Sequence, residues 1–183
     1  MIASAALLIR ERGARATSID DVLAHSGAPR GSVYHHFPGG RDELIEEATA
    51  FAGEFVDARL RAARDGSDPL AAFDEFLAGY RRDLVASDFR VGCPVAAVAI
   101  EARGDGDPLT ARAGAVFEGW SAGLADAFAD AGMSKRRAAE LAEFAIAAAE
   151  GAIVLSRARR SIEPFDRART ELTAALRSEF DEP

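Results

Sequence analysis

The sequence predicts an all-α fold of about nine helices, with an N-terminal three-helix domain followed by a larger helical domain. Apolar residues recur three and four positions apart along most of the chain, which is the spacing of one helix face. Glycines, prolines and capping Ser, Thr and Asp residues interrupt this pattern, as they do at helix ends. Hydrophobic residues make up 49% of the 183 positions, so the chain can bury a full core.

The first helix is expected in the opening string MIASAALLIRER, where apolar side chains share a face and Gly13 follows as a terminator. This opening segment lacks the basic start and the cleavage site of a signal peptide. We therefore expect it to be part of the folded domain.

A short second helix is expected to begin after Thr17 or Ser18, since either hydroxyl can accept a backbone N–H as a cap. It is expected to end near Ala24. A turn over residues 26–28 follows, in which only Gly27 adopts a left-handed backbone conformation without steric cost. The chain should therefore reverse tightly at this point.

The third helix is expected to follow at once, because Pro29 suits a first helical turn, where its missing N–H removes no hydrogen bond. Val33 and Phe37 lie four positions apart and are expected to face the core. An arginine fork, a bare backbone, a hydroxyl and two polar rings remain on the other surfaces: Arg30, Gly31, Ser32, Tyr34 and His35. Two short helices joined by a tight turn, with these groups on the second, indicate a DNA-binding helix-turn-helix.

In such a motif Arg30 is expected to hold a guanine with two hydrogen bonds, which would contribute about 1–3 kcal/mol of discrimination. Gly31 would let the helix approach the base edges closely. The alternative is a helical hairpin in some other all-α protein. That alternative leaves Arg30, Tyr34 and His35 on one short helix without an explanation.

The string RGSVYHHFP over residues 30–38 resembles the signature of the TetR family of bacterial transcriptional repressors. The resemblance implies that Arg30 and Gly31 contact bases. It also implies that Thr17, Tyr34 and His35 contact phosphates, and that Arg41 contacts the DNA backbone from the next helix. The candidate DNA-contacting residues are Thr17, Ser18, Arg30, Gly31, Ser32, Tyr34, His35 and Arg41.

Two positions depart from the family pattern. Gly39-Gly40-Arg41 stands where a serine-lysine pair is commoner, and Pro29 stands where a hydroxyl residue often binds phosphate. We expect the phosphate contact at position 29 to be missing, because proline has no hydroxyl group.

The net charge of −8 argues against a protein held to DNA by charge alone. Residues 1–45 carry five arginines against five acidic side chains, so the whole acidic surplus lies outside the expected DNA-binding domain. One cysteine cannot form an internal disulfide, and no apolar run reaches the ~20 residues of a membrane span. We therefore expect a cytoplasmic protein. The expected domains are a DNA-binding domain at residues 1–45 and a ligand-binding and dimerisation domain at residues 46–183.

A long helix is expected from Arg41 to about Arg64, with an apolar stripe formed by Leu44, Ala48, Phe51 and Phe55. Residues 66–69 should break it, and Asp68 should cap a helix that begins at Pro69. That next helix carries a second stripe: Leu70, Phe73, Leu77, Tyr80 and Leu84. Such a stripe is core or the wall of a pocket, and Tyr80 would need a partner for its hydroxyl if buried.

Cys93 is expected at a helix N-cap, followed by Pro94 in the first turn. A helix N-terminus can make a thiol reactive, so a sensing role is one reading of Cys93, and a buried small hydrophobe is the other. The string GCPVAAVAIEA that begins at Gly92, like the Gly-Gly-Arg run after Pro38, resembles the LmrA and YxaF branch of the TetR family.

A helix is expected from Pro108 to about Ala131, with large aromatic residues on one face that either fill a core or line a cavity for an apolar ligand. Glu150 stands among alanines, where it would face a pocket, pair with an arginine or lie at the surface. The candidate ligand-binding residues are Phe73, Tyr80, Cys93, Phe117, Trp120 and Glu150.

The last two helices are expected to begin after Ser134 and near Pro164. Both are amphipathic and the first is rich in alanine, which suits close packing in a symmetric four-helix dimer interface. The family resemblance implies the same arrangement. The alternative is that both helices complete the core of a monomer.

The expected function is a ligand-responsive transcriptional repressor that binds a near-palindromic operator as a homodimer and is released by a small apolar or aromatic effector. An activator or a thiol-sensing regulator of the same fold is the alternative. An enzyme is not expected, because no catalytic triad, phosphate loop or metal-ligand spacing is present, and adjacent His35 and His36 would lie on different helix faces. No cofactor or metal ion is expected.

Overall fold

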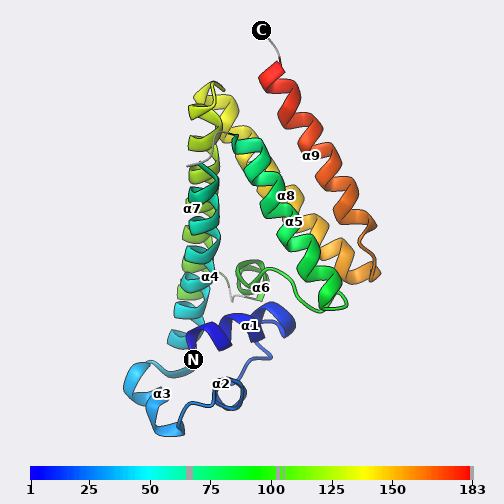
Figure 1. The fold of residues 1–183 in the computed structure, drawn as a ribbon. Coiled ribbons are helices and arrows are strands. Elements are labelled where there is room, and N and C mark those ends of the chain that lie inside the picture. The colour runs from blue at the N-terminus through cyan, green and yellow to red at the C-terminus, as the bar shows by residue number, and fades with distance from the viewer. Residues whose placement is uncertain (65–67, 102–103, 105, 182–183) are drawn as a thin grey trace. The chain divides into compact units, whose positions relative to one another are not determined.

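The computed structural model describes residues 1–64, 68–101, 104 and 106–181, and this part of the chain forms nine α-helices and no strand (Figure 1). The helices are α1 (Ile2–Arg12), α2 (Ile19–Ser26), α3 (Arg30–His36), α4 (Gly40–Arg64), α5 (Pro69–Ala86), α6 (Pro94–Glu101), α7 (Pro108–Asp130), α8 (Lys135–Arg159) and α9 (Glu163–Asp181). The all-α prediction is therefore confirmed. Gly66 and Ser67, in the predicted break after α4, lie outside the described residues.

The chain packs as two compact units, each made of two chain segments. Unit 1 contains Met1–Phe55 and Cys93–Phe117, and unit 2 contains Val56–Gly92 and Glu118–Pro183. The long helices α4 and α7 each contribute one part to unit 1 and the other to unit 2. A division after residue 45 stays a prediction, since the units follow packing and not one cut in the sequence.

In unit 1, α1 packs against α2 and α6. The apolar faces that the sequence pattern predicts are inside: Ile9, Val22 and Val33 are buried, and so is Phe37 just after α3. Burying each of these large side chains contributes roughly 1.5–3 kcal/mol to folding. The apolar sides of the three short N-terminal helices are therefore buried in the core of unit 1.

The apolar stripe predicted on α4 is buried only in its first half. Leu44 and Ala48 are buried, but Phe51 and Phe55 are 42% and 59% exposed. The neighbouring face is buried instead, because a Cβ on Gly53 would lie 2.8 Å from Cγ1 of Val116, so α4 and α7 touch there. That close approach turns the two phenylalanines outward.

The neighbouring face of α4 also contains a polar residue. Thr49 is buried there and donates its hydroxyl to the Ile45 carbonyl oxygen at 2.7 Å. Because this hydrogen bond satisfies the hydroxyl, the face can include a threonine without leaving an unpaired polar group.

In unit 2, α5, α8 and α9 pack against one another, and α7 adds Phe128 to a core that also includes Leu77 and Phe165. The start of α5 is capped as predicted, since Asp68 accepts the N–H groups of Leu70 and Ala71 at 2.9 and 3.1 Å. Ser134 likewise caps α8. In the described part of the chain, no helix is both long enough and apolar enough to span a membrane.

Two arginine–aspartate pairs fasten α9 to α5. Arg169 donates Nε and Nη2 to Asp74 at 2.7 and 2.6 Å, and Arg81 donates Nε and Nη2 to Asp166 at 2.7 and 3.0 Å. The hydrogen bonds from Arg169 lower the pKa of Asp74 below its ordinary value. Paired bonds of this kind fix orientation as well as distance, so they set the register of the two helices.

Candidate functional site

A reciprocal cap holds the start of α2, the first helix of the helix-turn-helix. Ser18 accepts the Asp21 N–H at 3.1 Å, and Asp21 accepts the Ser18 N–H at 3.0 Å and its hydroxyl at 2.5 Å. The bonds from Ser18 lower the pKa of Asp21 below its ordinary value. The helix ends at Ser26, two residues later than predicted, and Gly27 takes the expected left-handed conformation with φ of 69°.

The third helix presents the predicted groups to solvent. Pro29 is the N-cap residue and not the first helical residue that we expected, so α3 runs from Arg30 to His36. Val33 is fully buried, whereas Tyr34 is 65% exposed and His35 is also exposed. The side that faces away from the core therefore carries the arginine and the two polar rings together.

Arg30 forms an ion pair with the preceding helix. Its Nη2 lies 2.6 Å from Oδ1 of Asp20, and both side chains are mostly exposed. A guanidinium has five N–H donors, so other donors remain available to a base. The sequence alone did not identify Asp20 as the partner of Arg30, because the two residues belong to different helices.

Gly31 and Ser32 differ in what they can offer a ligand. A Cβ added at Gly31 would meet no atom within 4 Å, so the fold itself does not require glycine at this position. Ser32 donates its hydroxyl to the Pro29 carbonyl oxygen at 2.6 Å and is half-buried. Gly31 thus fits a close approach by DNA, and Ser32 helps to start the helix.

Thr17 and Arg41 are engaged inside the protein. Thr17 is fully buried and donates its hydroxyl to the Gly13 carbonyl oxygen at 2.8 Å. Arg41 donates Nε to the Thr17 carbonyl oxygen at 3.0 Å and Nη2 to that of Ala14. Thr17 and Arg41 thus hold the connection between α1 and α2. Because its side chain is buried and its hydroxyl is already bonded, Thr17 cannot reach a phosphate in this conformation, contrary to expectation.

Glu101 at the end of α6 holds the same connection from another side. Its Oε2 accepts the Arg15 N–H at 2.6 Å, and a Cβ at Gly13 would collide with its carboxylate. Gly13 has a φ of 91°, a conformation that also favours glycine. Sequence reasoning missed Glu101, since a carboxylate 86 positions away carries no local signal of this contact.

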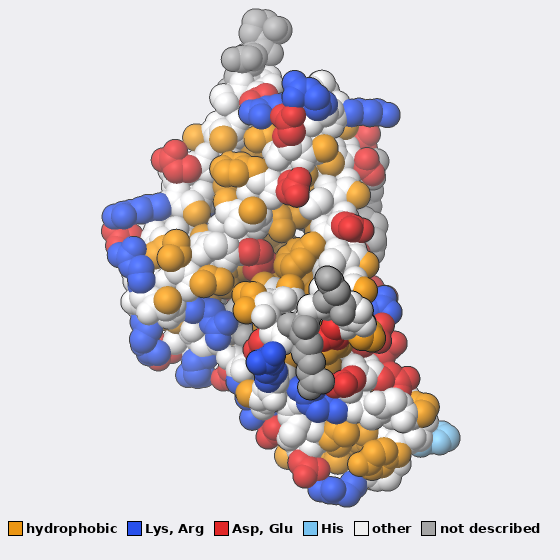
Figure 2. Space-filling model, turned by 180° about the vertical axis from the view of Figure 1, so that it is seen from behind, with side chains coloured by type: hydrophobic (Ala, Val, Ile, Leu, Met, Phe, Trp, Pro, Cys, Tyr) orange, Lys and Arg blue, Asp and Glu red, His pale blue; other side chains and the backbone are white. Residues whose placement is uncertain are grey.

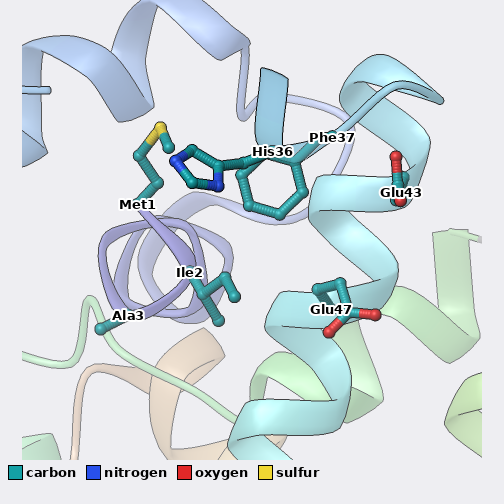
Figure 3. A pocket seen from close by; sticks show the side chains of 7 residues that line it. All are labelled: Met1, Ile2, Ala3, His36, Phe37, Glu43 and Glu47. Atoms are coloured by element: carbon teal, nitrogen blue, oxygen red, sulfur yellow. The ribbon is translucent and has the colours of Figure 1, made fainter. Parts of the chain in front are cut away.

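An open groove lies beside α3. Met1 and His36 line one side of it and Glu43 and Glu47 of α4 line the other (Figure 3). Oε2 of Glu43 also accepts the Gly39 N–H at 2.7 Å, just before α4 begins. Carboxylates repel phosphate, so this groove is a poor place for the DNA backbone.

Unit 2 contains a cavity enclosed by twelve described residues from α4, α5, α7, α8 and α9. Its empty volume is about 450 Å³, but it is narrow, and the centre of a water-sized sphere can move through about 30 Å³. Its walls are mainly aromatic and aliphatic, as in most small-molecule sites. The aromatic residues on it are Phe73, Phe76, Tyr80, Trp120 and Phe165.

Four of the six candidate ligand residues line this cavity: Phe73, Tyr80, Trp120 and Glu150. Glu150 lies on the cavity wall, which is one of the three positions considered for it. Cys93 and Phe117 are not on the cavity and belong to unit 1. Cys93 is buried just before α6, where its sulfur accepts the Ala96 N–H at 3.5 Å, so it serves as the predicted cap.

The outer face of α8 carries exposed apolar side chains. Phe144, Val154 and Leu155 are each at least 50% exposed, and exposed Gly151 lies among them. Figure 2, which views the molecule from behind, shows hydrophobic side chains between charged ones on the side where α8 lies in front.

The described residues contain no group of His, Cys, Asp and Glu side chains that could hold a metal ion.

Comparison with known families gives two matches. Residues 1–48 match the model of bacterial regulatory proteins of the tetR family, and residues 69–171 match the C-terminal domain of LmrA/YxaF-like transcriptional regulators. The first match contains the whole helix-turn-helix, and the second contains most residues of the cavity.

Individual proteins with similar sequences are also transcriptional regulators. The chain is 49% identical to the HTH-type transcriptional regulator Rv0196 of Mycobacterium tuberculosis, over 100% of this chain and 95% of that protein. It is 30% identical to the HTH-type transcriptional regulator YxaF of Bacillus subtilis, over 88% and 85% of the two chains.

Solved structures have the same fold. A regulatory protein TetR from Rhodobacter sphaeroides superposes with a TM-score of 0.83 at 24% identity, over 94% of this chain and 95% of that one. A TetR transcriptional regulator from Legionella pneumophila gives 0.84 at 19% identity, over 95% and 94%. With its N-terminal and C-terminal domains both matched, the chain belongs to the TetR family of transcriptional regulators, which are not enzymes, and has a C-terminal domain of the LmrA/YxaF-like type.

Proposed function

We propose that the protein is a homodimeric repressor that releases its operator when a small molecule occupies the cavity of unit 2. The observation that carries the DNA-binding half is the division of α3, with Val33 inside and Arg30, Tyr34 and His35 outside. A helix of this composition can place its first residues against base edges and its polar rings against phosphates. Since the proposed target is DNA, the proposed site of action is the cytoplasm.

The exposed apolar face of α8 supports a dimer. Phe144, Val154 and Leu155 leave water if α8 and α9 pack against their twofold copies, and Gly151 permits a close approach of the two backbones. A twofold axis repeats α3, and the two copies must then lie roughly 34 Å apart to meet successive major-groove faces. The proposed operator is therefore a near-palindrome.

The cavity supports ligand control. An effector that weakens operator binding about a hundredfold must favour the released state by ~2.7 kcal/mol. A cavity lined by five aromatic side chains can supply that difference through contacts made in one state only. The helices α4 and α7 each take part in both units, so a change of their axes in unit 2 can alter the spacing of the two α3 copies.

Selection of bound fragments from random DNA tests the proposal. We expect enrichment of one near-palindromic sequence with half-sites about one helical repeat apart, bound by two protomers. Apolar aromatic compounds should then release the selected DNA, and Leu155→Glu should yield monomers that bind it weakly. Enrichment of an unrepeated sequence, or of none, would contradict the proposal. Transcription from a promoter carrying the selected sequence separates a repressor from an activator.

A further inference from the structure

We propose that the cavity of unit 2 takes a small organic cation with apolar or aromatic groups. The inference rests on the proposed ligand-responsive function and names the chemical class of its effector. It follows from the kinds of side chain that the described cavity wall combines: five aromatic rings, six aliphatic side chains and one carboxylate, that of Glu150.

The aromatic wall on α5 is ordered by ring packing. Phe73 and Phe76 stack with their ring centroids 6.3 Å apart and an interplanar angle of 23°. Phe76 and Tyr80 meet edge to face at 5.3 Å and 70°. Ring faces carry negative charge density and attract a cation within about 6 Å of the centroid, most strongly when water is excluded. A fourth ring, Trp120 on α7, is also buried at this cavity.

Glu150 brings a carboxylate to the same space from α8. Its neighbours on the cavity wall, Ile146, Ala149 and Ile153, are apolar, and its Oε2 atom is buried. An ionic interaction is much stronger in such surroundings than in water, because the effective dielectric constant is low. A ligand ammonium group placed between the carboxylate and the rings would interact favourably with both.

The other charge classes fit less well. None of the described residues that line the cavity is Lys, Arg or His, so an anion would face the Glu150 carboxylate with no basic side chain on the wall. A neutral apolar molecule would gain the ring contacts but nothing from the carboxylate. The empty volume is about 450 Å³, but the centre of a water-sized sphere can occupy only about 30 Å³ of it, so the side chains of the wall must move apart to admit a compact ligand of one ring.

A matched pair of ligands isolates the effect of charge. Benzyltrimethylammonium and neopentylbenzene have nearly the same shape, and they differ in the positive nitrogen that replaces a carbon. Trp120, the single tryptophan of the chain, lies on the cavity wall, so its fluorescence reports binding, and calorimetry measures the cation independently. Neither measurement needs DNA.

Two variants of the full-length chain complete the test. Glu150→Gln removes the charge in the cavity at nearly constant shape, and Glu143→Gln removes an exposed charge from the same helix as a control. We expect the wild type to bind the cation about tenfold more tightly than the neutral compound, a ratio reasonable for one charged contact. Glu150→Gln should abolish this preference, and Glu143→Gln should keep it.

The proposal is overturned if the wild type binds the neutral compound as tightly as the cation, if the cation does not bind, or if Glu150→Gln keeps the preference. Should Glu150→Gln fail to fold, the comparison of the two ligands on the wild type still decides. The outcome is separable from that of the proposed function. A cation that binds in this way but does not release the selected DNA contradicts ligand control and leaves the ligand class standing.

Discussion

The guanidinium of Arg30 and the carboxylate of Asp20 lie 2.6 Å apart, Nη2 to Oδ1, across the two helices of the helix-turn-helix. Their side chains are 74% and 67% exposed. The arginine that is proposed to read a base is therefore already paired in the DNA-free protein. Phosphates and base edges must compete with this aspartate or share the guanidinium with it.

Asp20→Asn should tighten binding to operator and unrelated DNA alike. The substitution frees Arg30 and removes a negative charge near the DNA, and an exposed pair of this kind contributes at most ~1 kcal/mol, or about fivefold in affinity. Fluorescence anisotropy at low and high salt measures the effect, which should shrink as salt rises. Glu54→Gln, an exposed carboxylate of unit 1, is the control for net charge. Weaker operator binding by Asp20→Asn would mean that the aspartate positions Arg30 on the base.

Arg41→Ala should destabilise unit 1 in the absence of DNA. It removes the bonds from Arg41 to the carbonyl oxygens of Ala14 and Thr17, and a hydrogen bond to a charged group contributes about 1.5–3 kcal/mol. Urea unfolding of the DNA-free protein measures this loss, with Arg15→Ala, an exposed arginine of unit 1, for comparison. Unchanged stability together with weakened DNA binding would instead assign Arg41 to a phosphate, as the family resemblance implies.

Asp74→Asn should lower the melting temperature near pH 7 and have less effect in acid. Because the pKa of Asp74 is lowered in the folded state, its pair with Arg169 contributes stability above the ordinary value of 3.8 and loses it as the pH falls through the folded value. Melting curves of both proteins at pH 7 and near pH 3 test this. A difference that stays the same at both pH values would rule out the charge of Asp74 as the source of stability.

Much of the fold could be predicted from the sequence because its signals are local. The Ser18 and Asp68 caps, the Gly27 turn and the burial of Val33 each depend on residues a few positions apart. The expected division of α3 into a buried and an exposed side followed from spacing alone.

The errors concern partners that are distant in the sequence. On α4 two overlapping faces are both apolar, and only the contact of Gly53 with Val116 decides which one is buried. Similarly, the sequence does not reveal that Arg41 reaches the Thr17 carbonyl oxygen or that Glu101 reaches the Arg15 N–H. The predicted role of a polar side chain was therefore least secure where a backbone group could bind it instead.

Base reading by α3 is tested by comparing Arg30→Ala with Tyr34→Phe on a panel of operator variants. Arg30→Ala should change the ranking of the variants, because it removes the proposed base contact, which would contribute about 1–3 kcal/mol of discrimination at one position. Tyr34→Phe should weaken binding to all of them alike, since the Tyr34 hydroxyl is proposed to contact a phosphate and no base. If Arg30→Ala leaves the ranking of the variants unchanged, Arg30 does not read a base and the proposed recognition of the operator by α3 is wrong.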